Sequence, residues 1–252
     1  MSRTFAVIYE AQADFTTATE IADRVMLTEI DWLDAAILPF QRGWLAELPV
    51  GRWLTWSSIP SRAREQGIRV RGHFDGEPGL PDAQAARRAI AYILHVADTI
   101  DAIVLVRDMD DQTERANGLK QARQVYSSRC RIVIGAANRE REAWVISGFH
   151  PGDDAEKNAL ALETQKLGHD PCLHSHELTA GKNDQALRSP KRVLKALTGG
   201  DWSREQKCWH ETPLQVLKER GAGNGLANYL DEVKVHLVPL ISGRANEGPN
   251  ER

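Results

Sequence analysis

The stretch Ala102-Ile-Val-Leu-Val106, followed at once by Arg107-Asp-Met-Asp-Asp111, does most to decide the fold. A continuous apolar run rich in β-branched residues is typical of a strand that is buried on both faces. Strands of this kind belong to parallel sheets, because helices cover both faces of such a sheet. The acidic residues after Val106 are therefore expected at the carboxyl end of a strand, where open α/β sheets place their ligand crevice.

Two more buried strands and three helices are predicted around this strand. The strands cover 5–9 and 132–136, and the helices cover 15–28, 83–98 and 112–127. Asp82 is a candidate N-cap of the second helix, and Asp111 is a candidate N-cap of the third. The alternation of strands and helices predicts an α/β fold, with a mostly parallel, Rossmann-like sheet flanked by helices.

The expected domain organisation is a core followed by a helical extension. The core covers 1–148 and contains an insertion rich in tryptophan and arginine at about 29–67. Alternating apolar and polar residues over 68–74 predict a half-exposed or edge strand after the insertion. The extension covers 149–242, and the tail 243–252 has little apolar content and is expected to be flexible.

Within the extension, residues 153–188 are polar and are expected to be irregular. A helix is predicted to begin at Ser189-Pro190, because serine is a favoured N-cap and proline a favoured first helical residue. Further helices are predicted from Pro213 onward and over 225–240.

The composition is that of an ordinary globular protein. The chain of 252 residues is 42% apolar and 27% charged, and its net charge of -3 excludes a histone-like polybasic protein. Three widely spaced cysteines argue against a disulfide framework and for a reducing compartment. No apolar run reaches the length of a secretory or membrane-spanning segment, so a cytoplasmic protein is expected.

Carboxylates follow two of the predicted strands. Glu10 comes directly after the first strand, and Asp108 and Asp110 come directly after the strand at 102–106. Neighbouring parallel strands bring such loops into one crevice, and residues two apart in an extended segment point the same way. Grouped carboxylates repel one another unless a cation lies among them, and Mg²⁺ or Mn²⁺ suits such oxygen ligands. The alternative is that these acids only form turns or cap helices.

These motifs resemble those of a known fold. Glu10-Ala-Gln-Ala-Asp14 and Asp108-Met-Asp110, each after an apolar strand, resemble the Toprim fold of topoisomerases, primases and overcoming-lysogenization-defect nucleases. The segments Arg141-Glu-Ala-Trp144, Ser189-Pro-Lys-Arg192 and Gly225-Leu-Ala-Asn-Tyr-Leu230 are similar to segments of small stand-alone Toprim-like proteins, domain-of-unknown-function family 4276. The order of the motifs along the chain carries the resemblance.

The resemblance implies a metal-dependent nuclease that hydrolyses phosphodiesters, with DNA, RNA and tRNA open as substrates. The implied catalytic and metal-binding residues are Glu10, Asp108 and Asp110, with Asp111 as a further ligand of Mg²⁺ or Mn²⁺. The implied supporting residues are Asp14, Arg115 and Glu142. Glu142 is equally well explained as a charge that complements a helix N-terminus. The family usually has glycine where this chain has Ala11.

The resemblance also implies a partner. Members are often encoded beside AAA-type ATPases in loci suspected of antiviral defence, which implies an ATPase partner and a role in anti-phage defence. The alternative is a non-catalytic, Toprim-shaped subunit that docks on an ATPase or on nucleic acid. Both alternatives are compatible with a homo-oligomer.

Arginine and tryptophan are interleaved in and near the predicted insertion. The candidate nucleic-acid contacts are Arg42, Arg52, Arg62, Arg64, Trp53 and Trp56. Arginine pairs with phosphates and tryptophan stacks on bases, so this mixture suits single-stranded or distorted nucleic acid. The alternative is a local tryptophan core with solvated arginines around it.

Two further patterns in the sequence suggest other kinds of site. His169-Asp-Pro-Cys-Leu-His-Ser-His176 contains zinc-ligand types, and Cys208 with His210 is a remote second pair; the alternative is a polar loop. Haloacid-dehalogenase-type phosphatases also place Asp-x-Asp after a strand, but Gln112 stands where they carry threonine. No P-loop, dinucleotide-binding glycine motif or nucleophile elbow is present in the sequence.

Overall fold

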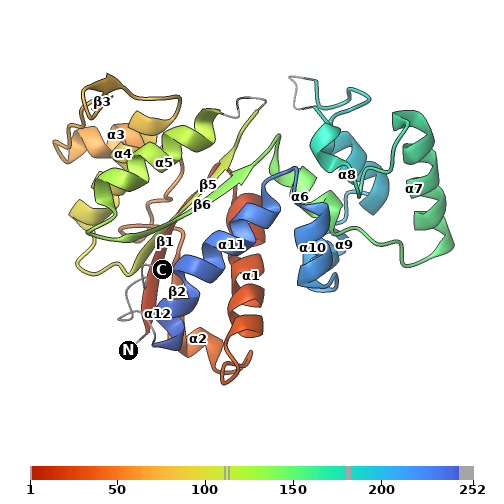
Figure 1. The fold of residues 1–252 in the computed structure, drawn as a ribbon, viewed down its shortest axis with the longest axis horizontal. Helices are drawn as coiled ribbons and strands as arrows, with labels where there is room; N and C mark the ends of the chain where they lie inside the picture. The colour runs from red at the N-terminus through yellow and green to blue at the C-terminus, as the bar shows by residue number, and fades with distance from the viewer. Residues whose placement is uncertain (1, 111, 113, 180–182, 244–252) are drawn as a thin grey trace, which may run out of the picture. The chain divides into compact units, whose positions relative to one another are not determined.

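The computed structural model describes residues 2–110, 112, 114–179 and 183–243 (Figure 1). By their internal contacts these residues form two compact units. The first unit consists of the described parts of 1–107, 114–135 and 231–252, and the second of those of 108–113 and 136–230. The units are therefore interleaved along the chain.

A four-stranded parallel sheet belongs mainly to the first unit, in the order β2-β1-β5-β6. Its strands are β1 (Arg3–Ile8), β2 (Arg42–Leu45), β5 (Ala102–Asp108) and β6 (Arg131–Ala137). In β1, Ala6 pairs with Leu45 on one side and with Ile103 on the other. Residues 5–8 are completely buried, as expected for a strand covered on both faces. The predicted α/β class is thus confirmed.

Helices cover this sheet on both faces (Figure 1). On one side α4 (Ala83–Val96) packs between α3 (Ile59–Glu65) and α5 (Glu114–Tyr126). On the other side α1 (Gln12–Glu29) packs against α12 (Val238–Ser242). Alanines and isoleucines of α4 that face the sheet are buried, which is the apolar stripe that predicts an amphipathic helix.

The side chain of Glu232 covers part of the β6 edge. It lies on α11 (Leu226–His236), and its Oε2 accepts the backbone N–H of Ile134 at 3.2 Å. The same carboxylate accepts two hydrogen bonds from Arg123 of α5, at 2.6 and 2.8 Å. The Ile134 N–H therefore has a partner within the unit. Without this partner, a backbone donor at a strand edge can pair with a strand of another chain.

The segment 29–67 is part of the sheet rather than only an addition to it. It supplies the short helix α2 (Leu38–Gln41), the edge strand β2 and helix α3. The predicted strand over 68–74 is wrong. Only its end, β3 (His73–Phe74), is a strand, and it pairs with β4 (Glu77–Pro78) in a separate two-stranded sheet.

Asp82 is the N-cap residue of α4, as predicted, but its side chain does not cap the helix. Asp82 has a left-handed backbone, with φ of 63°, and its side chain makes no cap hydrogen bond. Its Oδ2 instead accepts a hydrogen bond from Arg107 Nε at 2.9 Å. The Asp82 carboxylate therefore binds Arg107 of β5, and it does not accept a backbone N–H of α4.

The second unit is helical. Its helices are α6 (Arg141–Ser147), α7 (Asp154–Leu167), α8 (Pro190–Thr198), α9 (Trp202–His210), α10 (Leu214–Arg220) and the start of α11, with a 3-10 turn η1 (Ser175–Glu177). Helix α8 begins as predicted, because Ser189 Oγ accepts the N–H of Arg192. The expectation that 153–188 is irregular is wrong for 154–167, since α7 begins after the N-cap Asp153 and ends at Leu167, before the C-cap Gly168.

Asn224 lies at the centre of the second unit and is completely buried. Its Nδ2 lies within hydrogen-bond distance of Ala143 O, Ser147 Oγ and Ser175 Oγ, at 2.7 to 2.8 Å. Its own carbonyl accepts the indole N–H of Trp144 at 2.9 Å. One buried amide thus ties α6, η1 and the start of α11 together.

Gly225 follows Asn224 in a conformation that only glycine adopts readily. Its φ is +89°, and an added Cβ would lie 2.1 Å from the carbonyl oxygen of Ala136. Both the backbone angle and the close approach explain why glycine occupies this position.

The three cysteines are free and buried. Burial raises the pKa of the Cys130 thiol to about 11 and that of the Cys208 thiol to about 12, so both are unreactive packing residues. Within the described part of the chain, no helix has an apolar stretch of the length needed to cross a bilayer.

Candidate functional site

Glu10 lies in the first unit, just beyond β1, and is held by an arginine. Its Oε1 accepts a hydrogen bond from Arg107 Nη1 at 2.9 Å. The Arg107 guanidinium also lies 5.2 Å from the Trp56 ring centroid and donates to Asp82. Arg115 Nε lies 3.6 Å from the same Asp82 carboxylate. Two acids and two arginines thus alternate at the carboxyl ends of β1 and β5, and sequence analysis did not identify Arg107 or Asp82 as members.

A cavity of about 310 Å³ opens beside Glu10. Its lining consists of Glu10, Trp56, Ser57, Ala85 and Arg107. The indole N–H of Trp56 donates to Val106 O at 2.7 Å, so the buried ring is a fixed wall of the cavity. The side chain of Glu10 is 34% exposed, so solvent reaches one side of this carboxylate.

Ala11 starts α1 without strain. Its backbone is extended, with φ of -127°, so this position does not require glycine. Asp14 is 7% exposed, and its Oδ2 accepts the N–H of Ala11 at 2.7 Å. The Asp14 carboxylate therefore stabilises the backbone turn that follows Glu10. In this way Asp14 supports the position of Glu10.

Asp108 and Asp110 lie in the second unit, at the end of β5 and just beyond it. Asp108 Oδ1 accepts the backbone N–H of Arg141, the first residue of α6, at 2.9 Å. Asp110 is exposed, has a φ of 44°, and donates its own N–H to Arg139 O at 3.1 Å. Asp111, the further expected ligand, lies outside the described residues.

Glu140 and Lys191 join this acidic group, and sequence analysis did not identify them. Burial raises the pKa of Glu140, and the negative charges of Glu142 and Asp110 raise it further. Lys191 Nζ lies 3.5 Å from Glu140 Oε1 and opposes this shift. The signals were present in the sequence: Glu140 lies two residues before Glu142, and Lys191 is inside the Ser-Pro-Lys-Arg segment.

Glu142 lies on the first turn of α6. Its Oε1 is 3.4 Å from Arg141 Nη2, which is also 3.1 Å from Glu205 Oε2. The Arg141 guanidinium lies over the Trp202 ring, 5.6 Å from its centroid. Glu142 is thus both a charge at a helix N-terminus and a neighbour of Glu140.

The candidate nucleic-acid contacts have different surroundings. Arg42 pairs with Asp23, whose carboxylate also accepts the Trp44 indole N–H. Arg52 pairs with Glu65 at 2.6 Å. Trp53 is half-exposed, whereas Trp56 is the buried cavity wall described above. Arg62 Nη1 is buried, and no hydrogen-bond partner for it lies among the described residues.

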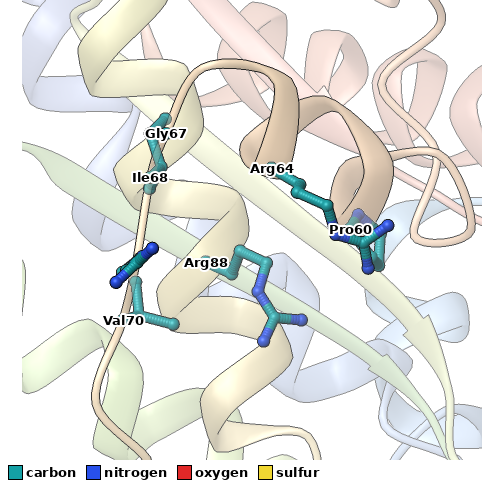
Figure 2. Close-up of a pocket in the computed structure, with 7 residues that line it drawn as sticks. Pro60, Arg64, Gly67, Ile68, Val70 and Arg88 are labelled. Carbon is teal, nitrogen blue, oxygen red and sulfur yellow. The ribbon is translucent and has the colours of Figure 1, made fainter.

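Arg64 belongs to a basic pocket (Figure 2). The pocket has a volume of about 520 Å³ and lies between α3, α4 and the extended segment 67–70. Arg69 and Arg88 also line it, and no acidic residue does. Among the described residues no carboxylate pairs with any of these three guanidinium groups. Three unpaired cations around one hollow favour an anionic ligand.

Comparisons of the chain with protein-family models, with curated proteins and with solved structures find no match. The likeness to Toprim proteins therefore stays an expectation that the short motifs carry.

Proposed function

We propose that this protein is a metal-dependent nuclease that hydrolyses phosphodiester bonds, as its resemblance to Toprim proteins implies. The observation that carries the proposal is the group of carboxylates around Glu140. Burial raises the pKa of this glutamate most, the charges of Glu142 and Asp110 raise it further, and Lys191 lowers it, so the carboxylates repel one another despite the lysine. A divalent cation bound among these groups would relieve the repulsion.

The chemistry of the group fits Mg²⁺ or Mn²⁺, which prefer oxygen ligands. When bound, such an ion supplies charge neutralisation for a phosphate and a water of lowered pKa. Asp108, Asp110 and Glu140 would hold it once their side chains draw together, because their carboxylate oxygens do not all lie within 4.8 Å of one another in the structure. The bond from Arg141 N–H fixes the orientation of the Asp108 carboxylate, as hydrogen bonds to metal ligands commonly do. Lys191 is 45% exposed and would contact a phosphate oxygen of the substrate.

The role of Glu10 stays a prediction that rests on the resemblance. In the structure Glu10 forms an ion pair with Arg107. Glu10 could therefore bind a metal ion or transfer a proton only if this ion pair separated. Replacement of Glu10 by glutamine therefore belongs in the same assay as the aspartate variants.

The basic pocket supports nucleic acid as the substrate. Arg64, Arg69 and Arg88 can each neutralise a phosphate, and the pocket is large enough for part of a backbone. We expect the affinity for single-stranded DNA to fall with salt, and the slope of log K against log [salt] to decrease by about 0.7 for each phosphate contact removed. Arg64→Gln with Arg88→Gln should reduce this slope, and Arg52→Gln, whose arginine already pairs with Glu65, should not.

The first test is cleavage of plasmid DNA, single-stranded DNA and total RNA in Mg²⁺ or Mn²⁺, compared with EDTA. Asp108→Asn is the decisive variant, because asparagine can accept the Arg141 N–H as aspartate does but is a poor metal ligand. Asp153→Asn is the matched control, since Asp153 only caps α7. We expect wild type and the control to cut, and Asp108→Asn and Asp110→Asn to lose at least about 100-fold. Cleavage by both aspartate variants would contradict the proposal.

A non-catalytic subunit that docks on a protein partner, with an AAA-type ATPase as the partner that the resemblance implies, is the second candidate. Exposed apolar side chains in and before α2 favour it: Phe40 is 76% exposed, Trp32 50% and Ile37 37%. Such a concentration of exposed apolar residues is typical of an interaction surface. This candidate would be favoured if the protein captures the partner and cleaves no substrate. Phe40→Ser should abolish the capture, and Leu162→Ser should leave it intact. Leu162 is a control because it is similarly exposed on a different helix, α7.

A further inference from the structure

A cluster of imidazole and carboxylate groups lies between α7 and α8, apart from the residues discussed above. His174, His176 and Glu177 each offer a ligand atom, and these atoms all lie within 4.8 Å of one another. His176 and Glu177 belong to the 3-10 turn η1, and His174 directly precedes it. Among the described residues this is the one group of three or more such side chains gathered so closely.

The Glu177 carboxylate lies between two histidines. Its Oε1 is 3.6 Å from His174 Nδ1, and its Oε2 is 3.5 Å from His169 Nδ1. These separations are longer than hydrogen bonds, which measure about 2.7–3.2 Å for N–H···O. They are close to the separation of about 3.4 Å between two ligands of one tetrahedral Zn²⁺ with bonds of about 2.0–2.1 Å.

Two of the imidazole nitrogens lack a protein partner. His169 Nε2 and His176 Nδ1 are both buried and have no hydrogen-bond partner among the described residues. A buried polar atom without a partner costs about 1–3 kcal/mol. His176 Nδ1 calls for an explanation, and a bound ion at the site is one. His169 Nε2 does not bear on this ion, because the Nδ1 atom of that ring is the one that faces Glu177. The sequence pattern alone placed this segment in a polar loop and did not identify Glu177.

The surrounding structure fixes the turn that carries the cluster. Ser175 Oγ accepts from the buried Asn224 at 2.8 Å and lies 3.1 Å from Ser147 Oγ. Gly223 packs directly on the imidazole, because an added Cβ would lie 2.6 Å from His176 Cγ. The N–H of Glu177 donates to His174 O at 2.9 Å. The ligands are therefore held close to one another before any ion binds.

We propose that His174, His176 and Glu177 bind one Zn²⁺ ion. Imidazole nitrogens select zinc and related transition metals over Mg²⁺ and Ca²⁺, which prefer oxygen. Side chains of His174 and Glu177 are about half-exposed, so the ion reaches the site from solvent. Cys172 is buried and is not a member of this group of neighbouring ligand atoms. The ion would fasten the chain between α7 and α8.

The test uses the full chain, stripped of metal with a chelator and exchanged into metal-free buffer. Zn²⁺ is titrated by calorimetry, and Co²⁺ is titrated separately by its visible absorption, which reports tetrahedral coordination. Bound zinc per chain is counted after gel filtration. These readouts do not depend on nuclease activity, so this proposal and the proposed function can fail separately.

The variants are Glu177→Gln, the pair His174→Ala with His176→Ala, and the control His73→Ala, which removes an exposed histidine of β3. We expect one zinc per wild-type chain, an affinity at least about tenfold lower for Glu177→Gln, and no retained zinc for the double variant. His73→Ala should bind as wild type does, and excess Mg²⁺ should not displace the zinc. Equal zinc binding by wild type and the double variant, or no retained zinc on wild type, would overturn the proposal. Glu177→Gln changes only an exposed side chain of the same shape, so its result does not depend on altered folding.

Discussion

Replacement of Asn224 by alanine should destabilise the second unit strongly. The Asn224 amide nitrogen has two hydrogens, so at most two of its three contacts with Ala143, Ser147 and Ser175 are full hydrogen bonds. Its Oδ1 accepts a third bond, from Leu226 N–H at 3.0 Å. Three bonds at about 1 kcal/mol each, together with about 1–3 kcal/mol for a buried N–H left without a partner, give a loss of about 4–6 kcal/mol.

The assay is equilibrium unfolding in urea, followed by circular dichroism and by tryptophan fluorescence. The midpoint should shift to lower urea with little change in the slope of the free energy against urea. Asn183→Ala is the control, because Asn183 is exposed and its side chain accepts only the N–H of Gln185. A surface change of this kind costs no more than about 0.5 kcal/mol. A loss below about 1 kcal/mol for Asn224→Ala would refute the reasoning that one amide holds this core together.

Three further predictions concern titratable groups. Because the pKa of Glu140 is raised in the fold, mainly by burial, its charge destabilises the protein at neutral pH. Glu140→Gln should raise the unfolding free energy at pH 7 by about 0.5–2 kcal/mol, and the gain should vanish as the pH falls below about 4.3. Glu163 should behave oppositely: burial alone would raise its pKa, but hydrogen bonds from Arg192 and Lys166 lower it. Glu163→Gln should cost about 1.5–3 kcal/mol at pH 7, and pH-dependent unfolding should show this cost disappearing as the pH falls through the lowered pKa. The raised pKa values of Cys130 and Cys208 predict that neither thiol reacts with iodoacetamide at pH 8 until urea unfolds the chain; rapid labelling of the native protein would contradict this.

The fold was predictable where the local sequence of one segment is sufficient to indicate its secondary structure. Residues 5–9 and 102–106 are apolar without interruption, and such a short run rich in β-branched residues is typical of a strand covered on both faces. Helix α8 was predictable because its cap and its proline are adjacent. Helix α7 was missed because only two of its residues, Glu163 and Leu167, are buried, so it lacks the apolar stripe that reveals a helix.

The candidate site was predictable only in part, because its contacts join distant segments. The positions of Asp108 at the end of β5 and of Asp110 just beyond it were predictable, because both follow the apolar run 102–106 directly. Glu140 and Lys191 are 51 residues apart in sequence, and no local pattern indicates that they meet. The side-chain partner of Asp82 was missed for the same reason, since Arg107 belongs to another element.

The bond between Glu232 and Ile134 has a consequence for synthesis of the chain. The two residues are 98 positions apart, so a ribosome adding about 5–20 residues per second needs about 5–20 s to supply the second after the first. During that interval this backbone donor at the edge of β6 has no partner, in the presence of other unfinished chains. A fragment that ends at residue 148 would keep this edge open permanently, and it should aggregate where the full chain stays dispersed.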